Sequence, residues 1–452
     1  MGNNTLILIK RMLENIRIKW VEGEDWDFAG EDTQYLTHGL HPYPARMVPQ
    51  IARRLLRRFA SKNDVVLDPF CGSGGVLVEA RLAGLNSIGV DINPLACLLA
   101  EVKSNPIEPS LLESWWRRLK SQITREVISF KFEGVDIDLP NFSNTNIEYW
   151  FKPETMKELA IIRRSLEAIR ENHVRKFFEV PFSLTVREVS GVRKKEYKLY
   201  RLPEEEWKQY SPDVLGTFTR YVEKSIQKMR EFYREADKNV FSKVFMGDTR
   251  LLFTERFPYE GNELLKNYPP RIIVTSPPYG DSRTTVAYGQ FSRLSSLWLN
   301  FEPEFNTEVV MKVDKLSLGG DSNKCKKDID ADLPVLNQII EMIRERDERR
   351  SIETLAYFID LYDCLRKMYD SLDYGGYCCI VIANRTVRRL IIPTHIIIAE
   401  MGVKIGFENE IIIIPRNIPT KRLPWENAPE NIPGFKGKTM SRENIVIMRK
   451  SR

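Results

Sequence analysis

Long hydrophobic runs are missing from this 452-residue sequence. No apolar segment approaches the ~20 residues that a membrane-spanning helix requires. The N-terminal stretch MGNNTLILIKRM contains an apolar core of only four residues, which is shorter than a signal peptide needs. These absences predict a cytoplasmic protein with no membrane partner.

Cysteine and histidine are also scarce. The chain has 6 cysteines and 4 histidines, with no Cys-x-x-Cys pair and no cluster of histidines. Disulfide frameworks and structural zinc sites depend on such spacings. The sequence therefore predicts neither a disulfide scaffold nor a bound metal.

Net charge is small as well, at +6 from 68 basic and 62 acidic residues, so the total indicates little about partners. Its distribution is more informative. Residues 187–201 carry six Lys or Arg against two Asp or Glu, and residues 415–452 carry nine against three. Such patches suit a polyanion such as nucleic acid, although a solvated surface explains them equally well.

What the sequence does have is an alternation of short buried strands and helices. Residues 42–60 predict an amphipathic helix entered through prolines, residues 64–70 a strand, 76–84 a helix, 87–92 a strand and 94–103 a helix. A glycine-rich turn lies between the first strand and its helix. Strand, turn, helix and strand in this order predict an α/β fold with a doubly wound, mostly parallel, Rossmann-like sheet.

The alternation stops at residue 105 and resumes near residue 241. The intervening segment has long charged helical patterns and one expected hairpin, SLTVREV paired with EYKLYRL. Later strands are expected at 243–248, 272–276 and 377–383, and a helix at 352–372; residues 405–414 and 444–449 are expected to pair as an antiparallel edge. We therefore expect residues 1–104 and 241–452 to form one domain, with 105–240 as a partly helical inserted domain.

The first chemically informative stretch is VLDPFCGSGG. Asp68 ends a strand, and Gly72 and Gly74 permit the positive φ that brings backbone close to a ligand. No Lys-Ser or Lys-Thr follows, which excludes a P-loop, and Leu77 breaks a Gly-x-Gly-x-x-Gly pattern. Asp91 ends the next strand, where a carboxylate can accept both hydroxyls of a ribose; a helix N-cap or a solvated strand end is the alternative.

The second stretch is TSPPYG, directly after the buried strand RIIV. Proline holds φ near −65° and donates no backbone hydrogen bond, so Pro277 and Pro278 end the strand in a rigid turn. Taken alone, this is equally well a stiff turn with no chemical role. Together with the glycine turn, it predicts a site at the carboxyl edge of the sheet.

DPFCGSG, GVDINP and TSPPY together resemble the S-adenosylmethionine-dependent amino-methyltransferases of DNA, and most closely the N4-cytosine group, in which Ser-Pro-Pro-Tyr is usual. THGLHPYPARMVPQIARRLL resembles the family's helix at the methionine end of the cofactor, and VFMGD its segment near the adenine. The resemblance implies S-adenosylmethionine as cofactor, held by His41, Pro44, Asp68, Phe70, Cys71, Gly72, Gly74, Asp91, Ile92, Asp248 and Thr275. It implies Ser276, Pro277, Pro278 and Tyr279 as catalytic residues.

The chemistry explains these residue types. An exocyclic amine is a poor nucleophile because its lone pair is delocalised into the ring, so rigid acceptors must bind its N–H groups. The Ser276 hydroxyl and the Pro277 carbonyl are such acceptors, and Tyr279 offers an aromatic face to a base that has left the duplex. The implied partner is double-stranded DNA with base flipping, in a restriction-modification system whose cognate restriction endonuclease is a candidate partner.

Several alternatives stay open. They are N6-adenine methylation, RNA methylation at guanine N2 of tRNA, and a non-catalytic nucleic-acid-binding protein that keeps the fold. C5-cytosine chemistry is excluded, because it uses a Pro-Cys nucleophile and the chain has no Pro-Cys dipeptide.

Four regions are candidates for contacting DNA. Residues 105–240 are the first candidate for reading the recognition sequence and 303–350 the second. Beside the proline turn we expect contacts from Arg283, Thr284, Thr285, Tyr288 and Gln290. An extended C-terminal loop is expected to present Arg416, Lys421, Arg422 and Trp425.

Overall fold

The computed structural model describes residues 16–143, 145–194, 197–281, 285–300, 303–321, 333–419, 426–427, 437–438 and 440–451. Its centre is an 8-stranded sheet in the order β1-β9-β12-β6-β5-β2-β3-β4. The strands of this sheet are β1 Arg17–Trp20, β2 Val65–Asp68, β3 Asn86–Asp91, β4 Ser242–Met246, β5 Ile272–Thr275, β6 Tyr377–Ala383, β9 Glu410–Asn417 and β12 Arg442–Arg449. Four short strands pair separately, β7 Arg385–Val387 with β8 Leu390–Ile392 and β10 Glu426–Asn427 with β11 Gly437–Lys438.

The sheet is parallel except for β12, which runs antiparallel to both β6 and β9. The expected antiparallel pairing of residues 405–414 with 444–449 is confirmed as the pairing of β9 with β12, and so is the mostly parallel, Rossmann-like α/β fold. The antiparallel strand does not lie at the edge, however. β1 pairs with β9 and forms that edge, and its four residues carry no periodic signal strong enough to predict it.

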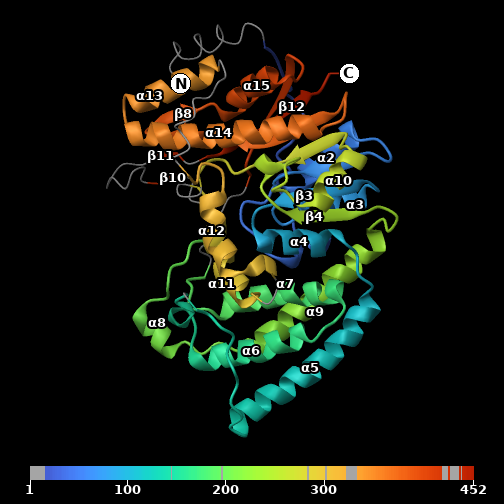
Figure 1. Cartoon of the computed structure of the whole chain (residues 1–452), viewed down its shortest axis with the longest axis vertical. Helices are drawn as coiled ribbons and strands as arrows, with labels where there is room; N and C mark the ends of the chain where they lie inside the picture. The colour runs from blue at the N-terminus through green and yellow to red at the C-terminus, as the bar shows by residue number, and fades with distance from the viewer. Residues whose placement is uncertain are drawn as a thin grey trace.

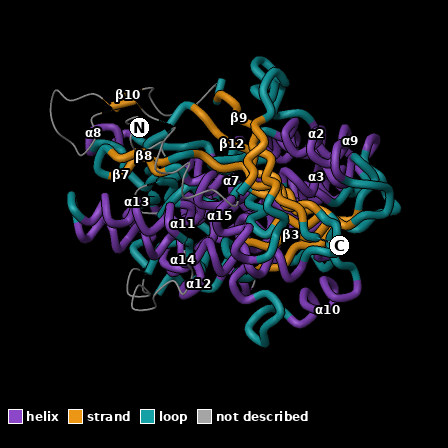
Figure 2. Tube along the Cα trace, turned by 90° about the horizontal axis from the view of Figure 1, so that it is seen from above, coloured by secondary structure: helices purple, strands orange, loops and turns teal. Residues whose placement is uncertain are grey.

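The helices either cover the two faces of the sheet or belong to a further helical layer. They are α2 Pro49–Phe59, α3 Gly75–Leu82, α4 Pro94–Ser104, α5 Pro109–Phe132, α6 Pro153–Glu167, α7 Asn172–Val189, α8 Glu204–Gln209, α9 Val214–Glu235, α10 Tyr259–Asn267, α11 Tyr288–Trp298, α12 Thr307–Leu316, α13 Pro334–Arg344, α14 Glu348–Ser371 and α15 Thr394–Ile405. Short 3₁₀ turns are η1 Leu36–Leu40, η2 Ile147–Tyr149, η3 Thr249–Leu251 and η4 Pro303–Phe305. Figure 2 shows α2 and α3 on one side of the band of strands and α10 and α14 on the other.

The helices between residues 109 and 235 form a separate layer. In Figure 1, α5, α6, α7 and α9 lie at one end of the long axis, and α13, α14 and α15 lie at the other, with β3 and β4 between them. One buried apolar cluster runs from this layer into α4 and α11. The layer is therefore packed directly against the elements that border the carboxyl edge of the sheet.

The expected hairpin of residues 183–189 with 196–202 is wrong. Residues 183–189 are the last two turns of α7, and the nearest β pairing is a single bridge between Val192 and Arg201. Buried Phe178, Phe182 and Val186 recur at helical spacing along α7. Packing of that stripe overrides the strand preference of the β-branched residues. The helix expected over 42–60 is also shorter, since α2 begins at Pro49.

Candidate active site

A pocket opens where the carboxyl ends of β2, β3, β4 and β5 meet, the edge at which open α/β sheets bind ligands. Its lining comes from the segment before α2, the two turns singled out in the sequence, the turn after β4, and α11 and α12 with the residues after it. The lining residues are Tyr43 to Met47, Pro49, Asp68 to Ser73, Gly75, Val76, Asp91 to Asn93, Gly247 to Arg250, Ser276, Pro278, Tyr288, Val313 and Leu316 to Leu318.

The glycine turn forms one wall of this pocket. Gly72 has φ +49°, and its backbone N–H donates to the Asp91 carboxylate at 2.9 Å. Gly74 has φ +81° and faces away, because a Cβ there would lie 2.6 Å from the Cα of Ala100. Gly72 thus opens backbone to the pocket, whereas Gly74 allows α3 and α4 to pack closely.

Two carboxylates lie at the ends of the neighbouring strands. Asp68 is 3% exposed and accepts a hydrogen bond from the Thr275 hydroxyl at 2.6 Å. Burial raises the pKa of Asp68 to about 7 and the pKa of Asp91 to about 6. Asp91 accepts backbone N–H groups from Gly72 and Asn93, at 2.9 and 2.8 Å. A carboxylate has about four lone-pair positions, so Asp91 can accept further donors from a ligand.

The proline turn forms the facing wall. Ser276 and Pro278 line the pocket, while Pro277 is buried behind them. The Pro278 carbonyl accepts a hydrogen bond from the Tyr357 hydroxyl of α14 at 2.7 Å. The Tyr279 side chain is oriented by hydrogen bonds of its hydroxyl with Glu443 and Ser276. Burial raises the pKa of Tyr279 well above the usual range. The turn is therefore held by contacts with α14 as well as by its own prolines.

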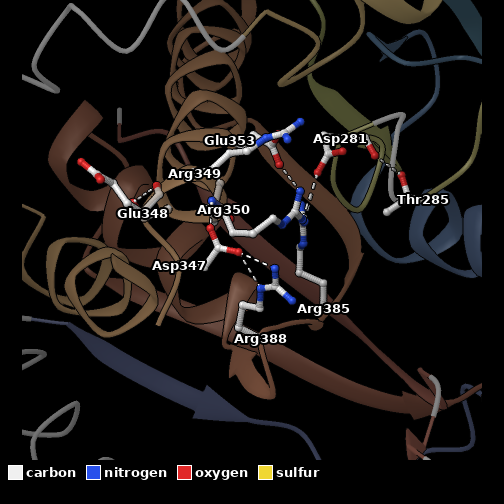
Figure 3. Close-up of polar contacts among 11 residues, drawn as sticks. Asp281, Thr285, Asp347, Glu348, Arg349, Arg350, Glu353, Arg385 and Arg388 are labelled. Atoms are coloured by element: carbon white, nitrogen blue, oxygen red, sulfur yellow. Dashed lines mark hydrogen bonds and ion pairs between the residues drawn. The ribbon is translucent and has the colours of Figure 1, made fainter. Parts of the chain in front are cut away.

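A buried ion-pair cluster fixes the chain beyond this turn (Figure 3). The Asp281 carboxylate is 3.1 Å from the Arg385 guanidinium of β7 and 3.8 Å from that of Arg350 on α14. Arg350 also pairs with Glu353. Arg385 packs so closely on Gly280 that a Cβ there would overlap its guanidinium. Through Asp281, β7 and α14 position the residues next to the proline turn.

Of the residues implied by the resemblance, ten line the pocket together: Pro44, Asp68, Phe70, Cys71, Gly72, Asp91, Ile92, Asp248, Ser276 and Pro278. Thr275 does not line the pocket, but its hydroxyl donates a hydrogen bond to Asp68, which does. Asp248 is held in a bidentate ion pair with Arg250, whose Nε and Nη2 donate to its two carboxylate oxygens. His41 does not reach the pocket lining. It is 1% exposed with its ring against Phe291, and burial lowers its pKa.

Of the residues expected to contact DNA, some line the pocket, some make hydrogen bonds within the protein, and others lie outside the described residues. Tyr288 lines the pocket and stacks on Tyr43 with ring centroids 6.0 Å apart. The Gln290 side chain accepts the backbone N–H of Leu199 at 3.3 Å, which joins α11 to the segment after α7. Thr285 hydrogen-bonds the Asp281 carbonyl at 2.8 Å. Lying outside the described residues are Arg283, Thr284, Lys421, Arg422 and Trp425.

The expectation for Arg416 is wrong. It lies in β9 and is 4% exposed, with its guanidinium paired to Glu443 of β12 and bonded to the Trp26 carbonyl at 2.8 Å. A side chain committed in this way is part of the sheet and not of a surface loop. The basic composition of the segment predicted a surface loop, but β9 continues through Asn417.

Further site residues were missed by sequence reasoning. Asn93 caps α4 and donates to the Tyr43 hydroxyl at 3.0 Å; its position before Pro94 was a usable signal. No local sequence signal could have identified Tyr357, Arg385 and Glu443. Their hydrogen-bond partners in or beside the turn are 79 to 164 residues away in sequence.

Within the described residues, no helix is long and apolar enough to cross a membrane. The same part of the chain has no group of three or more His, Cys, Asp or Glu placed to hold a metal ion. The pocket combines the glycine turn and the Asp91 carboxylate on one side with the proline turn and the Ser276 hydroxyl on the other. Such an arrangement can hold a hydroxyl-rich ligand beside hydrogen-bond acceptors that do not move.

Comparison with known proteins gives matches of two kinds. A family model described as DNA methylase matches residues 14–102. The chain is 35% identical over 430 residues to the type II methyltransferase M.MvaI of Kocuria varians, covering 93% of both chains. Shorter matches are 45% identity to type II methyltransferase M.MjaII of Methanocaldococcus jannaschii, over 18% of this chain and 16% of that one, and 46% to a tRNA (guanine(10)-N2)-dimethyltransferase of Methanothermobacter thermautotrophicus, over 11% and 16%.

Proposed function

This chain belongs to the type II DNA methyltransferase family, and from that premise we propose that it methylates the N4 amine of a flipped-out cytosine in DNA. The proposed methyl donor is S-adenosylmethionine. The observation that carries the proposal is the pocket itself, in which Ser276 faces the glycine turn and Asp91. A donor bound along the glycine wall therefore lies beside the acceptors that an exocyclic amine requires.

The residues present fit this cofactor. Gly72 leaves the wall open where a side chain would project, and Asp91 offers a carboxylate to the ribose hydroxyls. Asp248 and Phe70 lie along the same pocket, where the adenine is expected. When bound, S-adenosylmethionine supplies a methyl group activated by its sulfonium charge.

The protein's own contribution is to position the amine. Ser276 Oγ and the Pro277 carbonyl accept the two N–H groups, which lets the nitrogen lone pair leave conjugation with the ring. The proline rings and the Tyr357 bond to Pro278 hold these acceptors without reorganisation. Tyr279 is proposed to stack on the extruded base, which returns about 1 to 3 kcal/mol of the cost of flipping.

The choice of base rests on Ser276, a neutral hydroxyl in the pattern usual for cytosine N4 enzymes. N6-adenine methylation is the main alternative, since adenine presents a similar amine and the family includes N6 enzymes. The RNA alternative is weaker, because the tRNA enzyme matches only 11% of the chain while a DNA methyltransferase matches 93%.

Nucleoside analysis tests this proposal. Bulk DNA is incubated with the purified protein and S-adenosylmethionine, digested and examined by mass spectrometry. We expect N4-methyldeoxycytidine. N6-methyldeoxyadenosine would transfer the proposal to adenine, and the absence of any methylated nucleoside, with cofactor binding intact, would favour a non-catalytic DNA-binding protein. The proposed role in restriction and modification would be tested by protection of the methylated DNA from a cognate endonuclease.

Replacing Asp91 tests the placement of the cofactor. Asp91→Ala is expected to weaken S-adenosylmethionine binding by about 1 to 3 kcal/mol, the cost of leaving buried hydroxyls unpaired. The pKa of Asp91 is about 6, so its carboxylate is present above that pH and is lost as the pH falls through it. Calorimetry should therefore show wild-type affinity falling below about pH 6, with no such fall in Asp91→Asn. An unchanged dissociation constant in both variants would remove Asp91 from the ribose.

The recognition of DNA is proposed to lie in residues 105–240, as an inserted domain, with 303–350 as the second candidate. Arg193 and Lys194 are exposed, and Leu199 in the same segment is bonded to Gln290 of α11, whose Tyr288 lines the pocket. The basic segment is therefore joined to the helix that contributes Tyr288 to the pocket lining. A cluster of exposed cations there suits the phosphate backbone.

Salt dependence tests this placement. Replacing Arg193, Lys194 and Lys198 together with Ala is expected to lower the slope of log affinity against log salt by about 0.9 for each phosphate that is no longer neutralised. Lys266→Ala on α10, across the sheet from this segment, is the control and should leave the slope unchanged. Identical slopes for all three proteins would move recognition elsewhere.

A further inference from the structure

A line of side chains connects the interior of the sheet to the first residue of the proline turn. The Tyr279 hydroxyl is 2.9 Å from Glu443 Oε1 and 3.2 Å from Ser276 Oγ. Glu443 lies near the start of β12, opposite Ala383 of β6 on one side and Arg416 of β9 on the other. The antiparallel strand therefore delivers a carboxylate to the catalytic turn from a segment about 160 residues away.

Arg416 holds that carboxylate in place. Its side chain is 2% exposed, and its Nη1 pairs with Glu443 Oε2. Its Nε and Nη2 donate to the carbonyls of Trp26 and Asp27, at 2.8 and 3.1 Å. Arginine stays charged in proteins, so a permanent cation lies against the second oxygen of the Glu443 carboxylate.

This arrangement determines where the hydroxyl protons point. A carboxylate only accepts hydrogen bonds, so Tyr279 gives its single proton to Glu443. The Tyr279 oxygen then faces Ser276 with lone pairs only, and Ser276 must donate. The one proton of the serine hydroxyl is thereby directed away from the pocket, and the lone pairs of its oxygen are left for another partner.

The direction of the Ser276 hydroxyl proton matters because the target amine is also a hydrogen-bond donor. A serine hydroxyl that rotates freely can present its hydrogen to the amine, and two donors then face each other. We propose that Tyr279, Glu443 and Arg416 act as a positioning relay that sets the Ser276 hydroxyl as an acceptor toward the target amine. This inference rests on the proposed function of the pocket. Tyr279 thus has a role through its hydroxyl in addition to any stacking by its ring.

A double-mutant cycle tests the relay. Tyr279→Phe keeps the ring and removes only the oxygen, and it is expected to lower kcat about tenfold, the worth of roughly one oriented hydrogen bond. The dissociation constant of S-adenosylmethionine should stay the same, and KM for DNA should change little. In the Ser276→Ala background, Tyr279→Phe should have no further effect, because the relay acts only through the serine hydroxyl.

Two further variants complete the design. Glu443→Gln keeps the size of the side chain and loses the charge, so it is expected to lower kcat less than Tyr279→Phe and also only when Ser276 is present. Tyr259→Phe, on a ring that is 77% exposed on α10, is the matched control and should have wild-type turnover. Unfolding midpoints measured for every variant separate a loss of turnover from a loss of fold.

The outcomes are distinct. Equal fold-losses from Tyr279→Phe with and without Ser276 would show that Tyr279 acts independently, and wild-type turnover of Tyr279→Phe would also overturn the relay. The cycle is measured as total transfer of labelled methyl groups into DNA. It therefore tests the relay whichever base is modified, whereas an adenine product in nucleoside analysis would overturn only the choice of cytosine.

Discussion

Ser276→Ala is expected to lower kcat for methyl transfer by about 10²- to 10³-fold while leaving the affinity for S-adenosylmethionine unchanged. The magnitude is that of removing one preorganised hydrogen-bonding group from an active site. Ser276 lines the pocket from the proline turn, whereas the proposed cofactor contacts lie on the glycine turn and at Asp91. The loss should therefore appear in the chemical step and not in cofactor binding.

Single-turnover kinetics and calorimetry measure the two quantities separately. Pro277→Ala is a useful companion, because it keeps the backbone carbonyl but releases the ring that aims it. A smaller loss of kcat is expected there. Equal losses of turnover and of cofactor affinity in Ser276→Ala would show that the hydroxyl belongs to the cofactor site, and that the acceptors for the amine lie elsewhere.

The second large effect is expected at Asp281. Asp281→Asn removes the negative charge beside Arg385, whose side chain is 8% exposed. Breaking one side of a buried ion pair costs about 3 to 5 kcal/mol, because a charge is left desolvated without compensation. The stability of the protein, measured by urea denaturation, should fall by about that amount.

A second substitution should recover part of this loss. In Asp281→Leu with Arg385→Met, the buried charges are removed together, and apolar replacement of a whole pair is often neutral. Glu205→Gln breaks the exposed pair with Lys208 and should leave the unfolding midpoint unchanged. If Asp281→Asn were no more destabilising than Glu205→Gln, the cluster in Figure 3 would not anchor the turn.

Turnover should fall in Asp281→Asn as well, even under conditions in which the protein stays folded. Asp281 is two residues beyond Tyr279, and its carboxylate ties the turn to β7 and α14. Loss of this ion pair would allow the proposed acceptors, the Ser276 hydroxyl and the Pro277 carbonyl, to move relative to the proposed cofactor site. Small displacements of reacting groups carry large kinetic costs.

Sequence reasoning worked best where local chain geometry decides the structure. The strands ending in Asp68, Asp91 and Thr275 were predicted from short apolar runs and the turns after them. It failed at residues 183–189, where β-branched residues suggested a strand and the packing of α7 made a helix. It failed again at Arg416, where basic composition suggested a surface loop.

The sequence by itself determined the wall of glycines, the strand-end carboxylates and the stiff turn of Ser276 to Tyr279. Each of these depends on residues close together in the chain, because glycine permits positive φ, proline fixes φ, and parallel strands place their ends at one edge. Only the tertiary structure decided which groups hold that turn. Tyr357, Arg385 and Glu443 reach it from elements 79, 104 and 164 residues away, and contacts of that kind follow from how the sheet and helices pack, which no local pattern encodes.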